Sequence, residues 1–177
     1  MPLSDINQSA MMLRIEPLTR AHQRKAFDCG SSVLNEYLRN TARQHSEKGM
    51  SRTFVLVEDN NPCQILGFFT LAACEILVDK LPEKYAKRYP SQAPAAKLAR
   101  LAVAGHMRRK GLGTHMLLDA MGRILQVADH LGIIGFFVDA KDDATAEFYQ
   151  QFGFLPLPEN GLELFLPLAT IRKAFAG

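Results

Sequence analysis

The sequence predicts an α/β fold in which helices cover the faces of a mixed sheet, and three observations lead to this prediction. Segments typical of strands and of helices alternate along the chain, which is the pattern of a layered α/β domain. Apolar residues between Leu117 and Ala128 recur with the 3.6-residue period of an amphipathic helix. The run 133–139 is almost entirely apolar, as expected of a strand that is covered on both faces.

In the first half of the chain, short apolar runs predict three strands and a longer pattern predicts one helix. The expected strands are 13–16, 53–57 and 65–73. The last two form a hairpin, because the turn-forming residues 59–62 separate them. Residues 31–47 carry apolar side chains at helical spacing, and we expect Ser31 or Ser32 to cap this helix.

The second half begins with a polar excursion over 79–94, which three prolines interrupt and which has only short helical content. A fourth strand is expected over 97–104. Alternation places Ala99, Leu101 and Val103 on one face of this strand and Leu98, Arg100 and Ala102 on the other.

The second long helix is expected to begin near Thr114 and to stop at Gly132, a glycine in the C-terminal role. A short helix that carries Tyr149 follows, and Asp142 or Asp143 is its expected N-cap. The remaining expected elements are two strands, 133–139 and 162–166.

Length and composition exclude several classes of protein. A chain of 177 residues fits one domain, so we expect a single domain over 1–177 with a frayed N-terminus over residues 1–12. No signal-peptide pattern and no bilayer-spanning stretch is evident, so we expect a cytoplasmic protein without membrane contact. The three cysteines lack a C-x-x-C pattern and no two histidines stand four residues apart, so we expect no metal.

The stretch from residue 84 to residue 118 contains no Asp or Glu although it is rich in basic residues. A solvated face is the ordinary explanation of such a charge run. A surface for the phosphates of a cofactor or a nucleic acid is the other. The basic residues are Lys84, Lys87, Arg88, Lys97, Arg100, Arg108, Arg109 and Lys110.

The basic loop Arg108-Arg109-Lys110-Gly111-Leu112-Gly113-Thr114 separates the fourth strand from the second long helix. A helix N-terminus exposes unpaired N–H groups that attract anions, and glycines let the backbone approach a ligand closely. A Walker loop is excluded because Lys110 precedes the glycine, and a dinucleotide loop because Met116 stands at the position of its third glycine. The remaining pattern, R-x-x-G-x-G, predicts a pyrophosphate site.

This loop resembles the acetyl-CoA loop of the GNAT superfamily of N-acetyltransferases, and residues 98–103 and 146–154 resemble its flanking segments. The resemblance covers about residues 13–168. It implies the GNAT fold, a mixed and mostly antiparallel sheet with helices on both faces. It also implies that the fourth and fifth strands splay, so that the main chain of Leu101, Ala102 and Val103 pairs with acetyl-CoA, the co-substrate.

The same resemblance implies that Tyr149 is the general acid. A tyrosine hydroxyl, with an ordinary pKa of about 10, can protonate a leaving thiolate at neutral pH. A core tyrosine that packs with Phe148 and Phe152 is the alternative. Because the fourth strand has no carboxylate, the sequence favours an α-amine acceptor, whose pKa of about 7.7–8.0 leaves part of it neutral. Glu75, Glu36 or water remain open as the base.

Further segments resemble the acetyltransferase toxins of type II bacterial toxin–antitoxin pairs; they are 27–30, 34–35, 42–44, 51–53, 98–103 and 164–168. This resemblance implies acetylation of the α-amine of aminoacyl-tRNA, a block of translation, and neutralisation by a ribbon-helix-helix antitoxin. Phosphate contacts would supply most of the affinity for tRNA. The candidates are Lys84, Lys87, Arg88, Lys97 and Arg100.

Three alternatives to this function stay open. The first is a housekeeping acetyltransferase that acts on a small-molecule amine or a protein N-terminus. The second is an acetyl-CoA-binding regulator without catalysis. The third is a plain nucleic-acid-binding module, which the lack of interleaved aromatic residues disfavours. The sequence does not distinguish a homodimer from a monomer.

Overall fold

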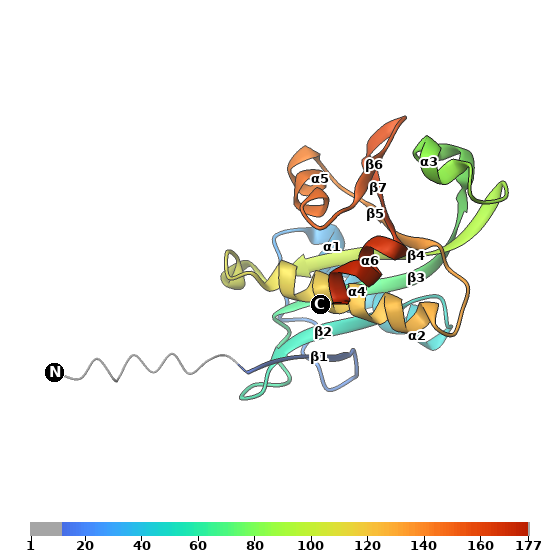
Figure 1. Cartoon of the computed structure of the whole chain (residues 1–177). Coiled ribbons are helices and arrows are strands. Elements are labelled where there is room, and N and C mark those ends of the chain that lie inside the picture. The colour runs from blue at the N-terminus through green and yellow to red at the C-terminus, as the bar shows by residue number, and fades with distance from the viewer. Residues whose placement is uncertain (1–11, 177) are drawn as a thin grey trace.

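The structure, a computed structural model, describes residues 12–176 and builds them around a sheet of seven strands in the order β1-β2-β3-β4-β5-β7-β6 (Figure 1). The strands are β1 (Leu13–Pro17), β2 (Arg52–Glu58), β3 (Gly67–Leu77), β4 (Gln92–Val103), β5 (Gly135–Asp139), β6 (Leu155–Leu157) and β7 (Asn160–Pro167). Only β4 and β5 pair in parallel, and the other neighbours are antiparallel. The prediction of a mixed, mostly antiparallel sheet is confirmed.

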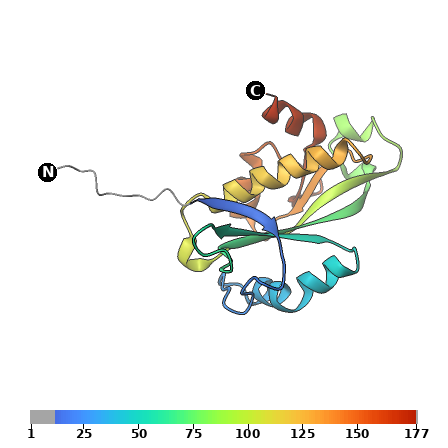
Figure 2. The ribbon, with the colours of Figure 1, turned by 90° about the horizontal axis from the view of Figure 1, so that it is seen from below.

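Helices cover both faces of the sheet, as predicted: α1 and α2 lie on one face and α4 and α6 on the other (Figure 2). The helices are α1 (Ser32–Glu36), α2 (Ala42–Glu47), α3 (Glu83–Ala86), α4 (Leu112–Ala128), α5 (Asp143–Gln150) and α6 (Leu168–Phe175). A π-helical segment, Tyr37–Thr41, joins α1 to α2, so the predicted helix over 31–47 is continuous but locally widened.

Side-chain caps fix two helix starts where the sequence predicts them. The hydroxyl of Ser31 accepts a hydrogen bond from the backbone N–H of Leu34 at 3.3 Å. The carboxylate of Asp142 accepts from the N–H of Thr145 at 2.8 Å and from its hydroxyl at 2.6 Å. The hydroxyl and then the N–H lower the pKa of Asp142. Both caps satisfy N–H groups that lack a partner inside their helix.

The boundaries of α4 differ from the prediction at both ends. The helix begins at Leu112, because Gly111 takes a left-handed backbone (φ +75°) at the N-cap. It ends at Ala128, and Gly132 is therefore not its terminator. In the predicted apolar stripe, Leu117, Met121 and Ile124 are buried, Leu125 and Ala128 are half-buried, and Leu118 is exposed.

The structure also contains strand and helix segments that the sequence pattern does not predict. β6 and α6 were not expected, β5 begins only at Gly135, and β4 begins at Gln92 in spite of Pro94. The carbonyl of Pro94 accepts from the N–H of Ile134, on the β5 side of the strand. Since N–H and C=O of one residue point to the same side of a strand, the missing N–H of Pro94 removes no β3–β4 hydrogen bond.

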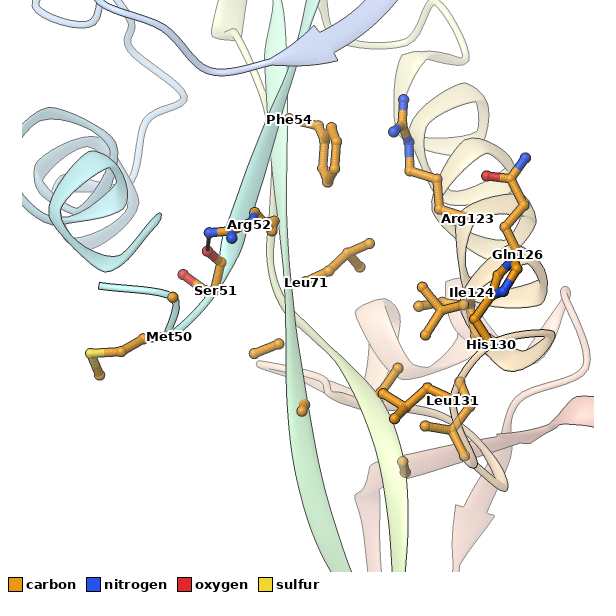
Figure 3. A pocket seen from close by; sticks show the side chains of 17 residues that line it. Met50, Ser51, Arg52, Phe54, Leu71, Arg123, Ile124, Gln126, His130 and Leu131 are labelled. Atoms are coloured by element: carbon orange, nitrogen blue, oxygen red, sulfur yellow. Dashed lines mark hydrogen bonds between the residues drawn. The ribbon is translucent and has the colours of Figure 1, made fainter. Parts of the chain in front are cut away.

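A bulge at Ala99 interrupts the alternation of β4. Leu98 pairs with Leu71, whereas Arg100 pairs with the next residue on β3, Thr70, so Ala99 is the extra residue. Leu71 faces α4 (Figure 3), and Leu98 shares that face. The Arg100 guanidinium lies on the opposite face, 4.6 Å from the ring centre of Tyr37. The prediction that Leu98, Arg100 and Ala102 share one face is therefore wrong.

The described residues begin at Met12, whose carbonyl accepts a hydrogen bond from Asp59 at 2.9 Å. Met12 is thus tied to the sheet, and the rest of the predicted frayed N-terminus, residues 1–11, lies outside the described residues, as does Gly177. Within residues 12–176, no helix combines the length and the apolar character needed to cross a membrane.

Candidate functional site

The sheet forks between β4 and β5. The two strands pair only at Ala96 with Phe136, Lys97 with Phe137 and Leu98 with Val138. Beyond Leu98, β4 continues to Val103 without a β5 partner, so the edge can bind an extended ligand. The Ala99 carbonyl is an exception, because it accepts a hydrogen bond from the Arg100 guanidinium at 2.8 Å. The predicted splaying of the fourth and fifth strands is confirmed.

The N-terminus of α4 opens beside this fork. Its cap residue, Gly111, provides no side chain, so the first N–H groups of the helix lack an intrahelical or capping partner. A Cβ added at Gly111 would meet nothing within 4 Å. A Cβ added at Gly113 would lie 4.0 Å from Val103 and 3.9 Å from Phe148. Gly113 therefore stands where the end of β4, the start of α4 and α5 converge.

The three cations of the loop differ in what they contact. The guanidinium of Arg108 donates to the carbonyl of Cys29 at 2.6 Å, and so ties the loop to the segment before α1. Arg109 has a left-handed backbone (φ +63°) and an exposed side chain. The ammonium of Lys110 is exposed and lies 3.9 Å from the sulfur of Met107. Arg109 and Lys110 thus present their charges to solvent at the helix N-terminus.

The remaining residues that were predicted to bind acetyl-CoA line the same region mainly through their main chain. The side chains of Ala102 and Leu112 are buried, whereas Leu101, Val103 and Thr114 are partly exposed. Ala102 and Leu112 can therefore contact a ligand only through backbone groups. This is the kind of contact that an extended pantetheine arm and a pyrophosphate need.

Tyr149 lies on α5 with only 5% of its surface exposed. Its ring packs edge-on against Phe148 (5.2 Å) and Phe154 (5.4 Å). Burial raises the pKa of Tyr149 to about 12, so the hydroxyl stays protonated at neutral pH. Within the described residues the hydroxyl has no hydrogen-bond partner. Its oxygen is not fully buried, so a ligand can reach it. The ring is therefore part of the core, whereas the hydroxyl is available to donate a hydrogen bond to a ligand.

An ion pair marks the point where the strands separate. The ammonium of Lys97 and the carboxylate of Asp139 are 2.8 Å apart, and both residues lie on the face opposite α4. Glu163 pairs with Asp139 across β5 and β7 and shares that face. Asp139 was not among the site residues predicted from the sequence. A signal was present, because Asp139 is the charged last residue of a strand that is otherwise apolar.

The carboxylates that the sequence left open as bases lie less favourably. Glu75 pairs with Pro94, and alternation along β3 places its side chain on the α4 face, opposite to Lys97 and Asp139. Glu36 is exposed at the end of α1. Asp139 is thus better placed at the fork than either residue.

The five basic residues predicted to contact tRNA fall into two groups. Two of them form ion pairs: Lys87 with Glu83 at 3.0 Å, and Lys97 with Asp139 at 2.8 Å. The other three lie over aromatic rings at two separate places: Arg100 is 4.6 Å from the ring centre of Tyr37, and Lys84 and Arg88 are each 5.7 Å from the ring centre of Tyr85. The structure therefore does not bring the five together as one patch.

A cavity of about 840 Å³ lies elsewhere, between the sheet and the C-terminal half of α4 (Figure 3). Phe54 and Leu71 of the sheet and Arg123 and Ile124 of α4 line it, and the Arg123 guanidinium lies 4.0 Å from the centre of the Phe54 ring. Its lining includes no residue of the loop 108–114 and none of α5. The volume of this cavity therefore gives no reason to choose the fork as the functional site. The reasons are the unpaired backbone groups of β4 and α4 and the exposed charges of Arg109 and Lys110. In the part of the chain that the structure describes, no three His, Cys, Asp or Glu side chains gather as a metal site.

Comparison with known proteins agrees with this geometry. Residues 49–156 match the family described as acetyltransferase (GNAT) domain. The chain is 32% identical to a probable toxin TacT of Sinorhizobium fredii, over 94% of this chain and 97% of that protein. It is 34% identical to a tRNA-acetylating toxin of Mycobacterium tuberculosis, over 83% of this chain and 87% of that protein.

Solved structures of toxins have the same fold. AtaT in complex with acetyl-methionyl-tRNAfMet superposes with a TM-score of 0.85 at 30% identity, over 92% of this chain and 99% of AtaT. A mutant AtaT bound to the C-terminus of the antitoxin AtaR and to acetyl-CoA superposes with a TM-score of 0.76 at 29% identity, over 93% and 99% of the two chains.

Proposed function

The chain belongs to the GNAT acetyltransferase family, and from this premise we propose that it transfers the acetyl group of acetyl-CoA to the α-amine of aminoacyl-tRNA and so blocks translation. The observation that carries the proposal is the fork between β4 and β5, with the open N-terminus of α4 on one side and Tyr149 on the other. All of these parts belong to one sheet and its helices, which supports a single acetyltransferase domain.

Acetyl-CoA fits the fork as the donor. The free N–H groups after Gly111 and the charges of Arg109 and Lys110 suit a pyrophosphate. The unpaired edge of β4 from Ala99 to Val103 suits the amides of the pantetheine arm. Arg108 contributes by holding the loop to Cys29. This arrangement would bring the thioester, which supplies the acetyl group, to the point where the strands separate.

In this scheme Tyr149 supplies the proton that the leaving thiolate requires. A pKa of about 12 keeps the hydroxyl protonated, and the absence of a partner among the described residues leaves it free to donate. The acceptor loses two protons on becoming an amide. One restores the Tyr149 hydroxyl and the other leaves to solvent.

The acceptor α-amine would approach from the face opposite α4, where the Lys97–Asp139 ion pair lies. We propose that the carboxylate of Asp139 attracts the α-ammonium group and accepts its first proton before that proton reaches solvent. An α-amine with a pKa of about 7.7–8.0 is already partly neutral, so a weakly basic carboxylate is sufficient. A tRNA substrate is supported by the names of the relatives and by the acid-free stretch 84–118.

We further propose that a small antitoxin with a ribbon-helix-helix DNA-binding domain neutralises the chain in the cytoplasm. Support comes from the toxin relatives and from the antitoxin bound to the similar AtaT structure. Co-expression of the neighbouring gene should restore growth in cells that express this chain. Size-exclusion chromatography with light scattering would distinguish a homodimer from a monomer.

The decisive experiment incubates the protein with radiolabelled acetyl-CoA and a mixture of charged tRNAs. We expect label on the amino acid of one or a few tRNA species, and loss of most of this label in Tyr149→Phe with acetyl-CoA binding retained. Label on free amines or protein N-termini but on no tRNA would instead support the housekeeping acetyltransferase. Full turnover by Tyr149→Phe would overturn its role as the acid.

A further inference from the structure

We propose that a basic pocket lined by tyrosines, between α3 and α6, binds the sugar–phosphate backbone of the acceptor tRNA near its 3′ end. The proposal rests on the proposed function, because it concerns the same tRNA substrate. The pocket has a volume of about 280 Å³, and the residues that carry the argument are Lys84, Tyr85, Arg88, Tyr89, Thr170 and Lys173. We call it the α3–α6 pocket.

The α3 side of the pocket is formed by α3 and the turn that follows it. Lys84 and Tyr85 belong to α3, whereas Arg88 and Tyr89 lie after its end at Ala86, and all four side chains line the pocket. The nearby acid, Glu83, is engaged with Lys87 in an ion pair of 3.0 Å, and neither residue lines the pocket. Glu83 and Lys87 thus neutralise each other, whereas the charges of Lys84 and Arg88 in the pocket are not neutralised by this acid.

The α6 side adds a third cation and a hydroxyl. Lys173 and Thr170 are three residues apart on α6, and both line the pocket. No carboxylate belongs to its lining, so three positive charges face one hollow without compensation by an acid of the lining. Such a hollow favours an anion with several charges in a row, and the backbone of a nucleic acid is one.

The tyrosines make the pocket suitable for a nucleotide rather than for an isolated anion. The ring of Tyr85 is held edge-on by Phe165 at 5.7 Å, and Lys84 and Arg88 both lie 5.7 Å from its centre. Cations beside aromatic rings are the combination that binds single-stranded nucleic acids, in which sugars and bases contact the rings and phosphates contact the cations.

The pocket lies on the path that a bound tRNA end would take. Ile134, which precedes β5, lines the pocket, and Asp139 ends β5 at the fork. Five strand residues span about 17 Å, the length of about five stacked nucleotides at 3.4 Å each. Tyr85 packs through Phe165 and Phe137 on the sheet face that also carries Asp139. An aminoacyl end at the fork would therefore place the pocket beside the nucleotides that precede the 3′ terminus.

The test measures binding of a fluorescent RNA hairpin, shaped like an acceptor stem with a CCA overhang, at several salt concentrations. The variant combines Lys84→Gln, Arg88→Gln and Lys173→Gln. The control, which removes the same number of charges, combines Arg20→Gln, Lys25→Gln and Lys48→Gln, three exposed residues that do not line the pocket. We expect the triple variant to bind at least tenfold more weakly. The slope of log affinity against log salt should flatten by about two to three, because each lost phosphate contact removes roughly 0.7–0.9. The control should stay within twofold.

Two readouts separate this proposal from the proposed function. Acetyl-CoA affinity and the melting temperature should be unchanged in the triple variant, which shows that it is folded. Acetylation of charged tRNA by the unchanged protein, with hairpin affinity and salt slope equal in the triple variant, would overturn the pocket alone. An equal loss in the control variant Arg20→Gln, Lys25→Gln, Lys48→Gln would also overturn it, since general surface charge would then explain the binding. Hairpin binding that depends on the pocket, without acetyl transfer to any charged tRNA, would overturn the proposed function and leave the pocket intact.

Discussion

Gly111 and Gly49 form a matched pair for testing the donor site. Both have a left-handed backbone with φ of +75°, and a Cβ added at either would meet nothing within 4 Å. Alanine in this conformation costs about 1–2 kcal/mol, and its smaller entropy loss on folding returns about 0.4–1 kcal/mol. Each Gly→Ala change should therefore destabilise the protein by about 1 kcal/mol, or roughly 2–4 °C in Tm for a chain of this length.

The two variants should differ only in donor binding. At Gly111 the new methyl group stands beside the free N–H groups that begin α4, where a phosphate oxygen must approach closely. We expect the Kd for acetyl-CoA to rise at least tenfold in Gly111→Ala, a loss of about 1.4 kcal/mol. Gly49 lies in the turn between α2 and β2, remote from this helix end, so Gly49→Ala should bind normally.

Isothermal titration calorimetry gives the two Kd values and thermal unfolding gives the two stabilities. Equal Kd values for Gly111→Ala and Gly49→Ala, at equal loss of Tm, would refute the assignment of the pyrophosphate to the N-terminus of α4. A weaker Kd in both variants would show that the effect comes from general destabilisation.

Three further predictions concern single groups. Burial raises the pKa of Tyr149 to about 12, from an unfolded value near 10. Between pH 10 and pH 12 the unfolded chain therefore loses the phenol proton while the folded protein keeps it, so the free energy of unfolding falls over this range. The difference in unfolding free energy between the unchanged protein and Tyr149→Phe should therefore shift by roughly 3 kcal/mol over this range. Ser31→Ala removes the cap on Leu34 and should cost about 0.5–1 kcal/mol in urea unfolding without changing acetyl transfer; a change in kcat would contradict a purely structural cap. Asp139→Asn should raise the KM for charged tRNA by up to about fivefold, because a half-exposed charge contact contributes about 0.2–1 kcal/mol; an unchanged KM would exclude its role in attracting the amine.

The sequence was sufficient for those parts of the fold that local patterns encode. The amphipathic stripe that ends at Ala128 predicted α4, and the caps at Ser31 and Asp142 are where serine and aspartate precede a helical pattern. The order of residues 108–114 predicted an anion site at a helix N-terminus, and the structure leaves those N–H groups free. Each of these features depends on residues that are close together in the chain.

Features that depend on pairing between distant segments were not predictable. The bulge at Ala99 exists only in the register of β4 against β3, and it moves Arg100 to the opposite face from Leu98. The ion pair of Lys97 with Asp139 requires the parallel pairing of β4 with β5. The hydrogen bond from Arg108 to the carbonyl of Cys29 joins residues 79 positions apart. No periodicity or short motif carries information of this kind.

The fork in the sheet has a consequence for the lifetime of the protein. A strand edge that a ligand completes makes that ligand part of the folded architecture, so binding adds to the free energy of unfolding. At a concentration hundredfold above Kd the gain is about 2.7 kcal/mol, which corresponds to roughly 5–10 °C in Tm at this chain length. When acetyl-CoA is scarce, a larger fraction of the molecules would be unfolded and accessible to proteases. Nutrient supply would thus set the survival of the protein as well as its turnover.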